Sequence, residues 1–353
     1  QLAKFKIFSI PEYIKYIPFC IFYECSSLRQ VSIPPSVTCI SEYAFYGCSS
    51  LVDVKMPFTL KSIQKGAFER CVSISKLEIP ISVIEIQEDA FSLCKSLRKI
   101  SITPNIKKIE KNTFYSCKSL NQVVIPSSVV CINDNSFMNC SSITHITIPS
   151  SVISIGNSAF CNCSSLKKIM IPSSIKAIGQ TIFYKCSMLT SINIPNSLLT
   201  IQDYAFYSCT QLSSLNITNT VSFIGTGAFS GCKVLSSINV PNLITSILGY
   251  TFDSCSSLET LVIPESIVSI EEHAFSSCSK LESINIPSSI TKISNYTFSG
   301  CSKLTSITIP EKVIYIGENA FASCIGFTSF IVPNNVNYIG EYAFSSCTGL
   351  TEI

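Results

Sequence analysis

The chain has 353 residues, of which 46% are hydrophobic and only 13% charged, and its formal net charge is +3. Soluble domains carry about 25% charged residues, so this chain is unusually apolar. Its apolar runs are nevertheless shorter than the roughly 18 to 20 residues of a membrane-spanning helix, which excludes membrane insertion by this segment. A chain this apolar can bury enough surface to fold, which excludes disorder.

One 23-residue repeat fills the chain. Fifteen cysteines, from Cys25 to Cys347, follow one another at intervals of 23 without a slip. A Phe stands three residues before each of them and an Ile eight residues before, as in Phe45 and Ile40. Such a unit cannot bury its apolar side chains alone, but stacked units can. The spacing predicts a single solenoid of about 15 units over residues 1–353.

Each unit predicts the same elements in the same order. Residues 28–33 begin the first complete unit, and Val31 and Ile33 lie two apart, on one face of a short strand. The Pro that follows ends this strand because it lacks an N–H group. An aliphatic pair at 37–40 then turns inward again, and the Ala-Phe-x-x-Cys segment 44–48 predicts a helical or 3₁₀ turn.

The stacked units predict ladders of identical side chains. The Phe residues would form a column of offset rings in the core, and the ladder Cys would be reduced thiols that pack as small hydrophobes. Inter-rung disulfides and a metal site are the alternatives, but neighbouring thiols would point in the same direction rather than at each other. The remaining cysteines make no convincing pair: Cys20, Cys39, Cys131 and Cys161.

A row of small polar residues follows each strand by three positions. We expect these side chains to bridge backbone groups of neighbouring units. The row begins Ser36, Thr59, Ser82, Asn105, Ser128, Ser151, Ser174.

No combination of residues predicts catalysis. The two histidines, His145 and His273, lie on opposite sides of the predicted coil and more than five units apart. No phosphate-binding loop, nucleophile elbow or zinc-protease motif occurs in the sequence. We therefore expect a protein that is not an enzyme and that has no cofactor and no metal.

The strand residues that point away from the core predict a binding face in the concave groove. We select nine candidate partner-binding residues: Lys55, Lys76, Lys99, His145, Lys168, Asn193, Asn216, Asn239 and Asn285. Residues 1–176 hold 19 Lys and Arg against 11 Asp and Glu, whereas 177–353 hold 6 against 11. The first half would attract an acidic partner and the Ser- and Asn-rich second half a neutral one. The basic residues form no dense run, so nucleic acid is not expected.

The repeat resembles one subclass of the leucine-rich repeats. Leu-x-x-Leu-x-Leu opens such units, and the continuation Pro-x-x-Val-x-x-Ile-Gly-x-x-Ala-Phe-x-x-Cys is similar to the BspA-like family. The unit at 304–324 carries this pattern most fully, with Pro310, Gly317 and Phe321 among its residues. The resemblance implies an α/β solenoid with a parallel β-sheet of short strands on the concave face and helical or 3₁₀ turns on the other side.

The resemblance also implies a function and a location. BspA-like repeats are typical of surface proteins, so the chain is expected to be the ligand-binding repeat region of a cell-surface or secreted adhesin. A protein is the expected ligand, with carbohydrate as the alternative, and the ends of the solenoid could associate end to end. The competing hypothesis is an intracellular scaffold or regulatory subunit in the cytoplasm, which the reduced cysteine ladder would suit.

Both ends of the sequence interrupt the repeat. Phe5, Phe8 and Ile10 fit the strand positions of a preceding unit, and Ile353 lies within the strand of another. Solenoids end in polar capping units, and neither end has one. We therefore expect a fragment of a longer chain that lacks both caps.

Overall fold

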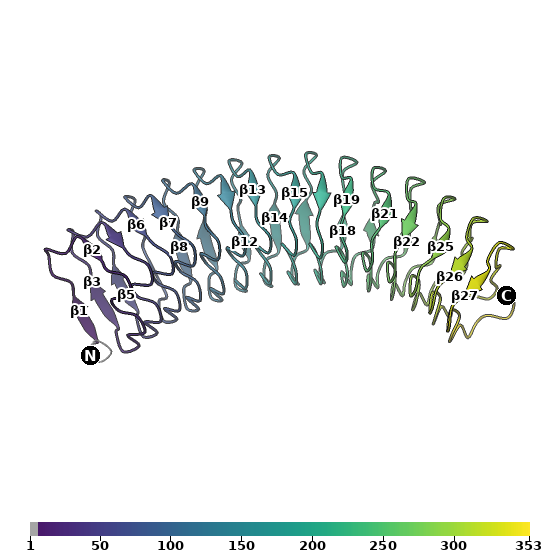
Figure 1. Cartoon of the computed structure of the whole chain (residues 1–353), viewed down its shortest axis with the longest axis horizontal. Coiled ribbons are helices and arrows are strands. Elements are labelled where there is room, and N and C mark those ends of the chain that lie inside the picture. Colours follow the sequence, from purple (N-terminus) through teal and green to yellow (C-terminus); the bar gives the residue numbers. More distant parts are fainter. Residues whose placement is uncertain (1–5) are drawn as a thin grey trace. The chain divides into compact units, whose positions relative to one another are not determined.

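The computed structural model describes residues 6–353 (Figure 1). These residues divide into two compact units, with the boundary between Ile175 and Lys176. Phe5 lies outside the described residues, whereas Phe8 is half-buried in a strand and Ile10 is buried. The 23-residue spacing continues through the boundary in the sequence. One solenoid over the whole chain, without caps, stays a prediction.

A first series of strands comes from the segments that open each repeat. Their middle residues are mostly buried, while the flanking residues point outward. In the first unit the series comprises β1 (Ile7–Ser9), β3 (Gln30–Ser32), β5 (Asp53–Lys55), β8 (Lys99–Ser101), β10 (Gln122–Val124), β12 (His145–Ile146) and β14 (Lys168–Met170). In the second unit it comprises β16 (Ser191–Asn193), β18 (Ser214–Leu215), β20 (Ser237–Ile238), β22 (Thr260–Leu261) and β24 (Ser283–Ile284).

A second series of two-residue strands ends on the inward Ile of each repeat. In the first unit these are β2 (Tyr16–Ile17), β4 (Cys39–Ile40), β6 (Ser62–Ile63), β7 (Glu85–Ile86), β9 (Lys108–Ile109), β11 (Cys131–Ile132) and β13 (Ser154–Ile155). In the second unit they are β15 (Ala177–Ile178), β17 (Thr200–Ile201), β19 (Phe223–Ile224), β21 (Ser246–Ile247), β23 (Ser269–Ile270), β25 (Lys292–Ile293), β26 (Tyr315–Ile316) and β27 (Tyr338–Ile339). The sequence pattern predicts that this segment turns inward, but it does not predict strands.

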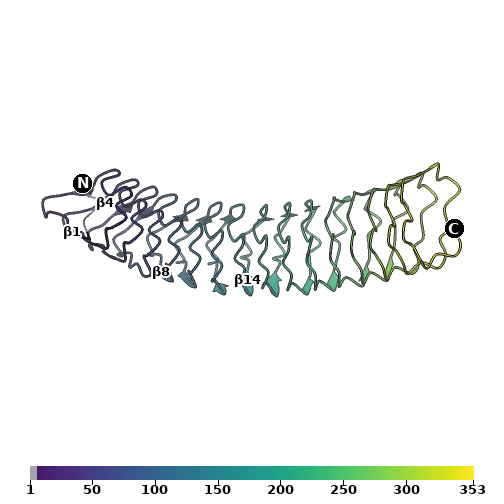
Figure 2. The same ribbon diagram turned by 90° about the horizontal axis from the view of Figure 1, so that it is seen from below.

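Strands pair in parallel at a register of one repeat. In the first series Val31 pairs with Val54, and in the second Ile40 pairs with Ile63, so each partner is 23 residues away. The same step holds in the second unit, where Ser214 pairs with Ser237. In Figure 2, β8 and β14 lie along the lower side of the first unit and β4 lies near its upper side. Most coils therefore carry two strands on different sides.

The helical turn predicted for the Ala-Phe-x-x-Cys segment is wrong, because residues 6–353 contain no helix. Two residues of each repeat have a positive φ, such as Tyr43 at 53° and Gly47 at 68°. This is the sign that a type II turn requires at its third residue, and it interrupts an α-helix. Every second N–H group of this segment donates to a carbonyl of the next repeat instead of one in its own coil. For example, Phe45 N–H donates to Ala67 O at 2.8 Å. The segment is a chain of β-turns that is hydrogen-bonded to its neighbours.

The predicted Phe column is confirmed in each unit. In the first unit, neighbouring rings from Phe22 to Phe160 have centroids 5.1–5.8 Å apart and planes within 15° of parallel. In the second unit the column runs from Phe183 to Phe344 with similar spacing. Near-parallel planes at this distance are offset stacks, which aromatic pairs favour. The column forms the centre of each core.

Most of the predicted polar row bridges neighbouring repeats, but Ser36 does not, because its buried Oγ has no hydrogen-bond partner among the described residues. Ser82 Oγ donates to Leu60 O and Ser128 Oγ to Ile106 O, each at 2.7 Å. These carbonyls belong to buried residues, and a buried acceptor without a hydrogen-bond partner would destabilise the fold. The short hydroxyl side chains therefore stabilise the turn that follows each strand.

Candidate functional site

The strand face consists of the outward side chains of the first strand series and of the residue before each strand. In β5 and β8 the two outer residues are exposed and the middle one is buried. Equivalent side chains of successive repeats lie one strand spacing apart, about 4.8 Å. This arrangement gives each unit long columns of similar side chains, the feature that repeat proteins use for binding.

The five candidate residues of the first unit are all exposed on the strand face: Lys55, Lys76, Lys99, His145 and Lys168. Lys99 and His145 line one hollow of about 680 Å³. Lys76 instead forms an ion pair with Glu78 at 2.6 Å. This hydrogen-bonded pair raises the pKa of Lys76 and lowers the pKa of Glu78. The charge of Lys76 is therefore matched within its own repeat.

The four candidate asparagines of the second unit differ in their roles. Asn216 is exposed and Asn193 is half-buried. Asn239 is held at the strand's end: Ile217 N–H donates to its Oδ1 at 2.7 Å, and its Nδ2 donates to Ile217 O at 2.6 Å. Asn285 clamps Ile263 in the same way. These two amides therefore stabilise the sheet, although Asn285 also lines a hollow of about 630 Å³.

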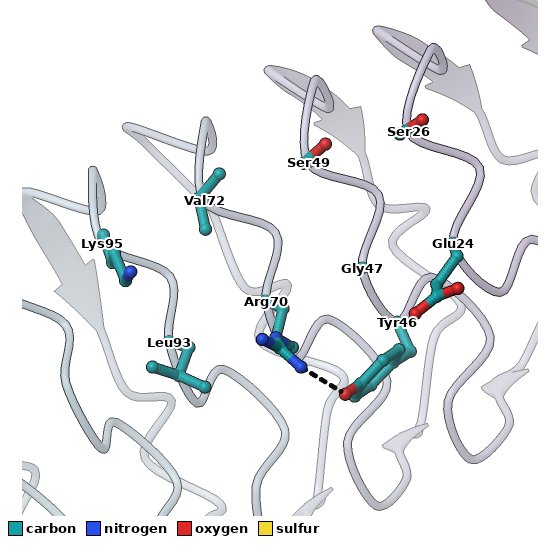
Figure 3. Close-up of a pocket in the computed structure, with 9 residues that line it drawn as sticks. All are labelled: Glu24, Ser26, Tyr46, Gly47, Ser49, Arg70, Val72, Leu93 and Lys95. Carbon is teal, nitrogen blue, oxygen red and sulfur yellow. Dashed lines mark hydrogen bonds between the residues drawn. The ribbon is translucent and has the colours of Figure 1, made fainter.

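Another hollow, which the sequence pattern does not predict, lies on the turn side of the first unit and measures about 370 Å³ (Figure 3). Gly47 leaves room between Glu24 and Arg70, because a Cβ at Gly47 would lie 3.1 Å from Glu24 Cγ. Arg70 Nη1 donates to Tyr46 Oη at 3.1 Å, and this bond raises the pKa of Arg70. Lys95 lines the far end. The only indication of this hollow in the sequence is one repeat position that carries Glu24, Gly47 and Arg70 in three successive repeats.

The two histidines lie in different units and have different neighbours. His145 Nδ1 lies 3.0 Å from Thr144 Oγ1. His273 lies on the turn side, as predicted, and stacks between Tyr250 and Tyr296 with centroids 4.5 Å apart on each side. Over residues 6–353 no group of three or more His, Cys, Asp and Glu is arranged to hold a metal ion. No helix in the same part of the chain could cross a membrane.

Comparison of the sequence with protein families identifies one match. A profile described as the BspA type leucine rich repeat region, six copies long, matches residues 2–121, 130–259 and 224–351. The three ranges together span nearly the whole chain. Among curated proteins, none matches significantly.

Solved bacterial structures share the fold. A leucine rich cell surface protein from Faecalibacterium prausnitzii is 31% identical, with 91% of each chain covered and a TM-score of 0.61. A leucine-rich repeat protein from Bacteroides ovatus is 26% identical, with 98% of this chain and 92% of that chain covered and a TM-score of 0.74. A third, from Eubacterium ventriosum, is 21% identical over 89% and 88% with a TM-score of 0.54, and it supports the fold alone.

Proposed function

Because this chain belongs to the BspA-type leucine-rich repeat family, we propose that it is the ligand-binding repeat region of a cell-surface adhesin. Its strand face binds a protein ligand, and the chain acts without catalysis. The surface location draws on one relative of 31% identity, which is described as a cell surface protein. The nine candidate residues are part of this proposal.

The observation that carries the proposal is the composition of the strand face. In the first unit the face is rich in Lys and Arg, whereas the strand face of the second unit has no basic residue and is made mainly of Ser, Thr and Asn. Short polar side chains on rigid strands can form many hydrogen bonds and lose little conformational entropy on binding. Such a surface suits recognition of a folded protein over several repeats.

The alternative is an intracellular scaffold, and one observation favours it. All nineteen cysteines are free, and most of them are buried. Free thiols persist best in a reducing compartment. Surface biotinylation of intact cells that express the chain in its natural context distinguishes the two locations. Labelled chain is the expected result, and labelling only after lysis would favour the scaffold.

Adhesion is tested with beads that carry the purified chain on cultured cell layers. We expect His145→Glu combined with Ser214→Glu to reduce attachment, because both substitutions add charge to the strand face. The matched control, Ser154→Glu with Ser222→Glu, places the same charge outside the strand face and should attach normally. Protease treatment of the cell layer should abolish attachment. Resistance to protease with sensitivity to periodate would point to carbohydrate instead, and equal attachment by both variants would exclude the strand face.

A further inference from the structure

We infer that the strand face of the first unit holds a two-anchor site for extended acidic protein segments. The two anchors are the pair Arg98 and Lys99 and the pair Lys167 and Lys168, three repeats apart, and all four side chains are exposed. Between them lies the hollow of about 680 Å³. This inference rests on the proposed protein-binding function and names the chemistry of the ligand.

The strand face also carries Lys6 and Arg29 near the start of the unit, but only the two anchors place two successive basic side chains on it. Lys76 is matched by Glu78 at 2.6 Å, and Lys55 shares its short strand with Asp53. The two repeats between the anchors have no acidic or lysine and arginine side chain on the strand face, since they present Asn121, Gln122, Val124, Thr144, His145 and Thr147. The face therefore offers two doubly basic positions that are separated by a neutral stretch.

The distance between the anchors determines how far apart two acidic residues of a ligand must lie. Three steps of about 4.8 Å place the anchors about 14 Å apart along the stack. An extended peptide advances about 3.3 Å per residue, so two acidic residues four positions apart span nearly the same length. Residues i and i+4 of an extended chain also point to the same side. The site thus fits an acidic residue at i and another at i+4.

The hollow between the anchors can accept the part of the peptide that lies between its two acidic residues. Its walls include the amides of Asn121 and Gln122 and the hydroxyl of Thr144, which can pair with peptide N–H and C=O groups. Val124, 58% exposed, offers an apolar contact. Arg98 can bind a carboxylate with two parallel hydrogen bonds. A sulfated polysaccharide carries anionic groups along its whole length and would match a continuous basic strip, which the neutral stretch interrupts.

The test uses three labelled seven-residue peptides of Ser and Val and measures fluorescence anisotropy at low ionic strength. The first has Glu at positions two and six, the second has Glu at positions two and four, and the third has Gln at two and six. We expect the first peptide to bind about fivefold more tightly than the second, which reaches one anchor, and the third not to bind. Added salt should weaken the binding because the anchors are exposed.

Substitutions in the chain locate the binding. R98S with K99S should lower the affinity for the first peptide to that for the second, and adding K167S and K168S should abolish binding. Ser occupies both positions of an anchor in other repeats, as Ser236 and Ser237, so these variants are expected to fold. The control, K107S with K108S, removes the same charge from exposed positions at the second strand series. It should leave the affinity unchanged within about twofold.

Three outcomes would overturn the inference. These are equal affinity for the two Glu spacings, an equal loss in the K107S and K108S control, and displacement of the peptide by heparin that itself binds more tightly through the same four residues. The last would assign the anchors to a polysaccharide. Loss of bead attachment without change in peptide binding, or the reverse, separates failure of the adhesin proposal from failure of this one.

Discussion

At the scale of single residues, the ladder cysteine has a defined partner. Cys140 Sγ donates to Phe114 O at 3.1 Å, and the same carbonyl accepts the N–H of Cys117 at 3.1 Å. The thiol thus occupies the second lone pair of a buried carbonyl oxygen. Ala could not donate this bond, and Ser would bring a shorter and more polar group into an apolar core. This contact explains why one residue type recurs at this position.

Because the ladder cysteines are buried, we predict that their thiols react much more slowly than those of the half-buried cysteines. Desolvation raises the pKa of Cys48 and of Cys94 to about 12, so only about one in ten thousand of these two thiols is ionised at pH 8. Cys39 and Cys131 lie at half-buried positions in β4 and β11. We expect iodoacetamide to label these two in the folded chain long before the ladder, as measured by peptide mass spectrometry. Uniform labelling of all nineteen cysteines before unfolding would contradict the prediction.

From the raised pKa of Glu69 we predict that the folded chain loses stability as the pH rises from mildly acidic to neutral. Burial, together with the nearby Asp89 carboxylate, raises the pKa of Glu69 from 4.5 to about 6. The folded chain therefore holds this proton more tightly than the unfolded chain, so the stabilisation is complete below pH 4.5 and is lost as the pH rises to about 6. Glu69→Gln should raise Tm at pH 7.5 and leave it nearly unchanged at pH 4. An unaltered pH profile of Tm would show that Glu69 ionises at its ordinary pKa.

At the scale of the element, the first strand series was predictable, whereas the second series and the turns were not. Alternation at Val31 and Ile33 identified the first strand series because a strand's period shows within a few residues. The two-residue strands of the second series are too short for a period to show. The turn residues vary in type, from Gly47 to Arg70 and Thr181, although all have a positive φ. Contacts between repeats impose that conformation, so local residue preference could not indicate it.

We predict that the substitution Thr181→Gly stabilises the folded chain. Its φ is 52°, which is unfavourable for a β-branched residue. Thr181→Gly removes this strain, and after the larger conformational entropy of glycine in the unfolded chain is subtracted, we expect a gain of about 0.5–1 kcal/mol. The control is Thr200→Gly in the strand β17, which should cost about 0.5–1 kcal/mol. Urea unfolding measures both, and a loss of stability at both positions would refute the role of strain at Thr181.

At the scale of the whole molecule, the binding face was predictable from the repeat but its hollows were not. The columns of outward residues follow from the register of 23, so the spacing alone assigns Lys99 and His145 to one face. Whether neighbouring side chains leave a hollow depends on their lengths and directions, which a repeat pattern does not specify. The clamps made by Asn239 and Asn285 were missed for a similar reason, since an exposed Asn is equally suited to a ligand and to the backbone.

The repeat architecture predicts that damage to the core spreads only to neighbouring repeats. Phe114 is 1% exposed and stacks on Phe91 at 5.7 Å and on Phe137 at 5.3 Å. Phe114→Ala removes both contacts and should cost about 3–5 kcal/mol locally. Because each repeat contacts only its neighbours, hydrogen exchange should accelerate most near residues 91–137 and fall off with distance within the first unit. Equal acceleration at every repeat would show instead that the unit unfolds as one cooperative block, with no local opening.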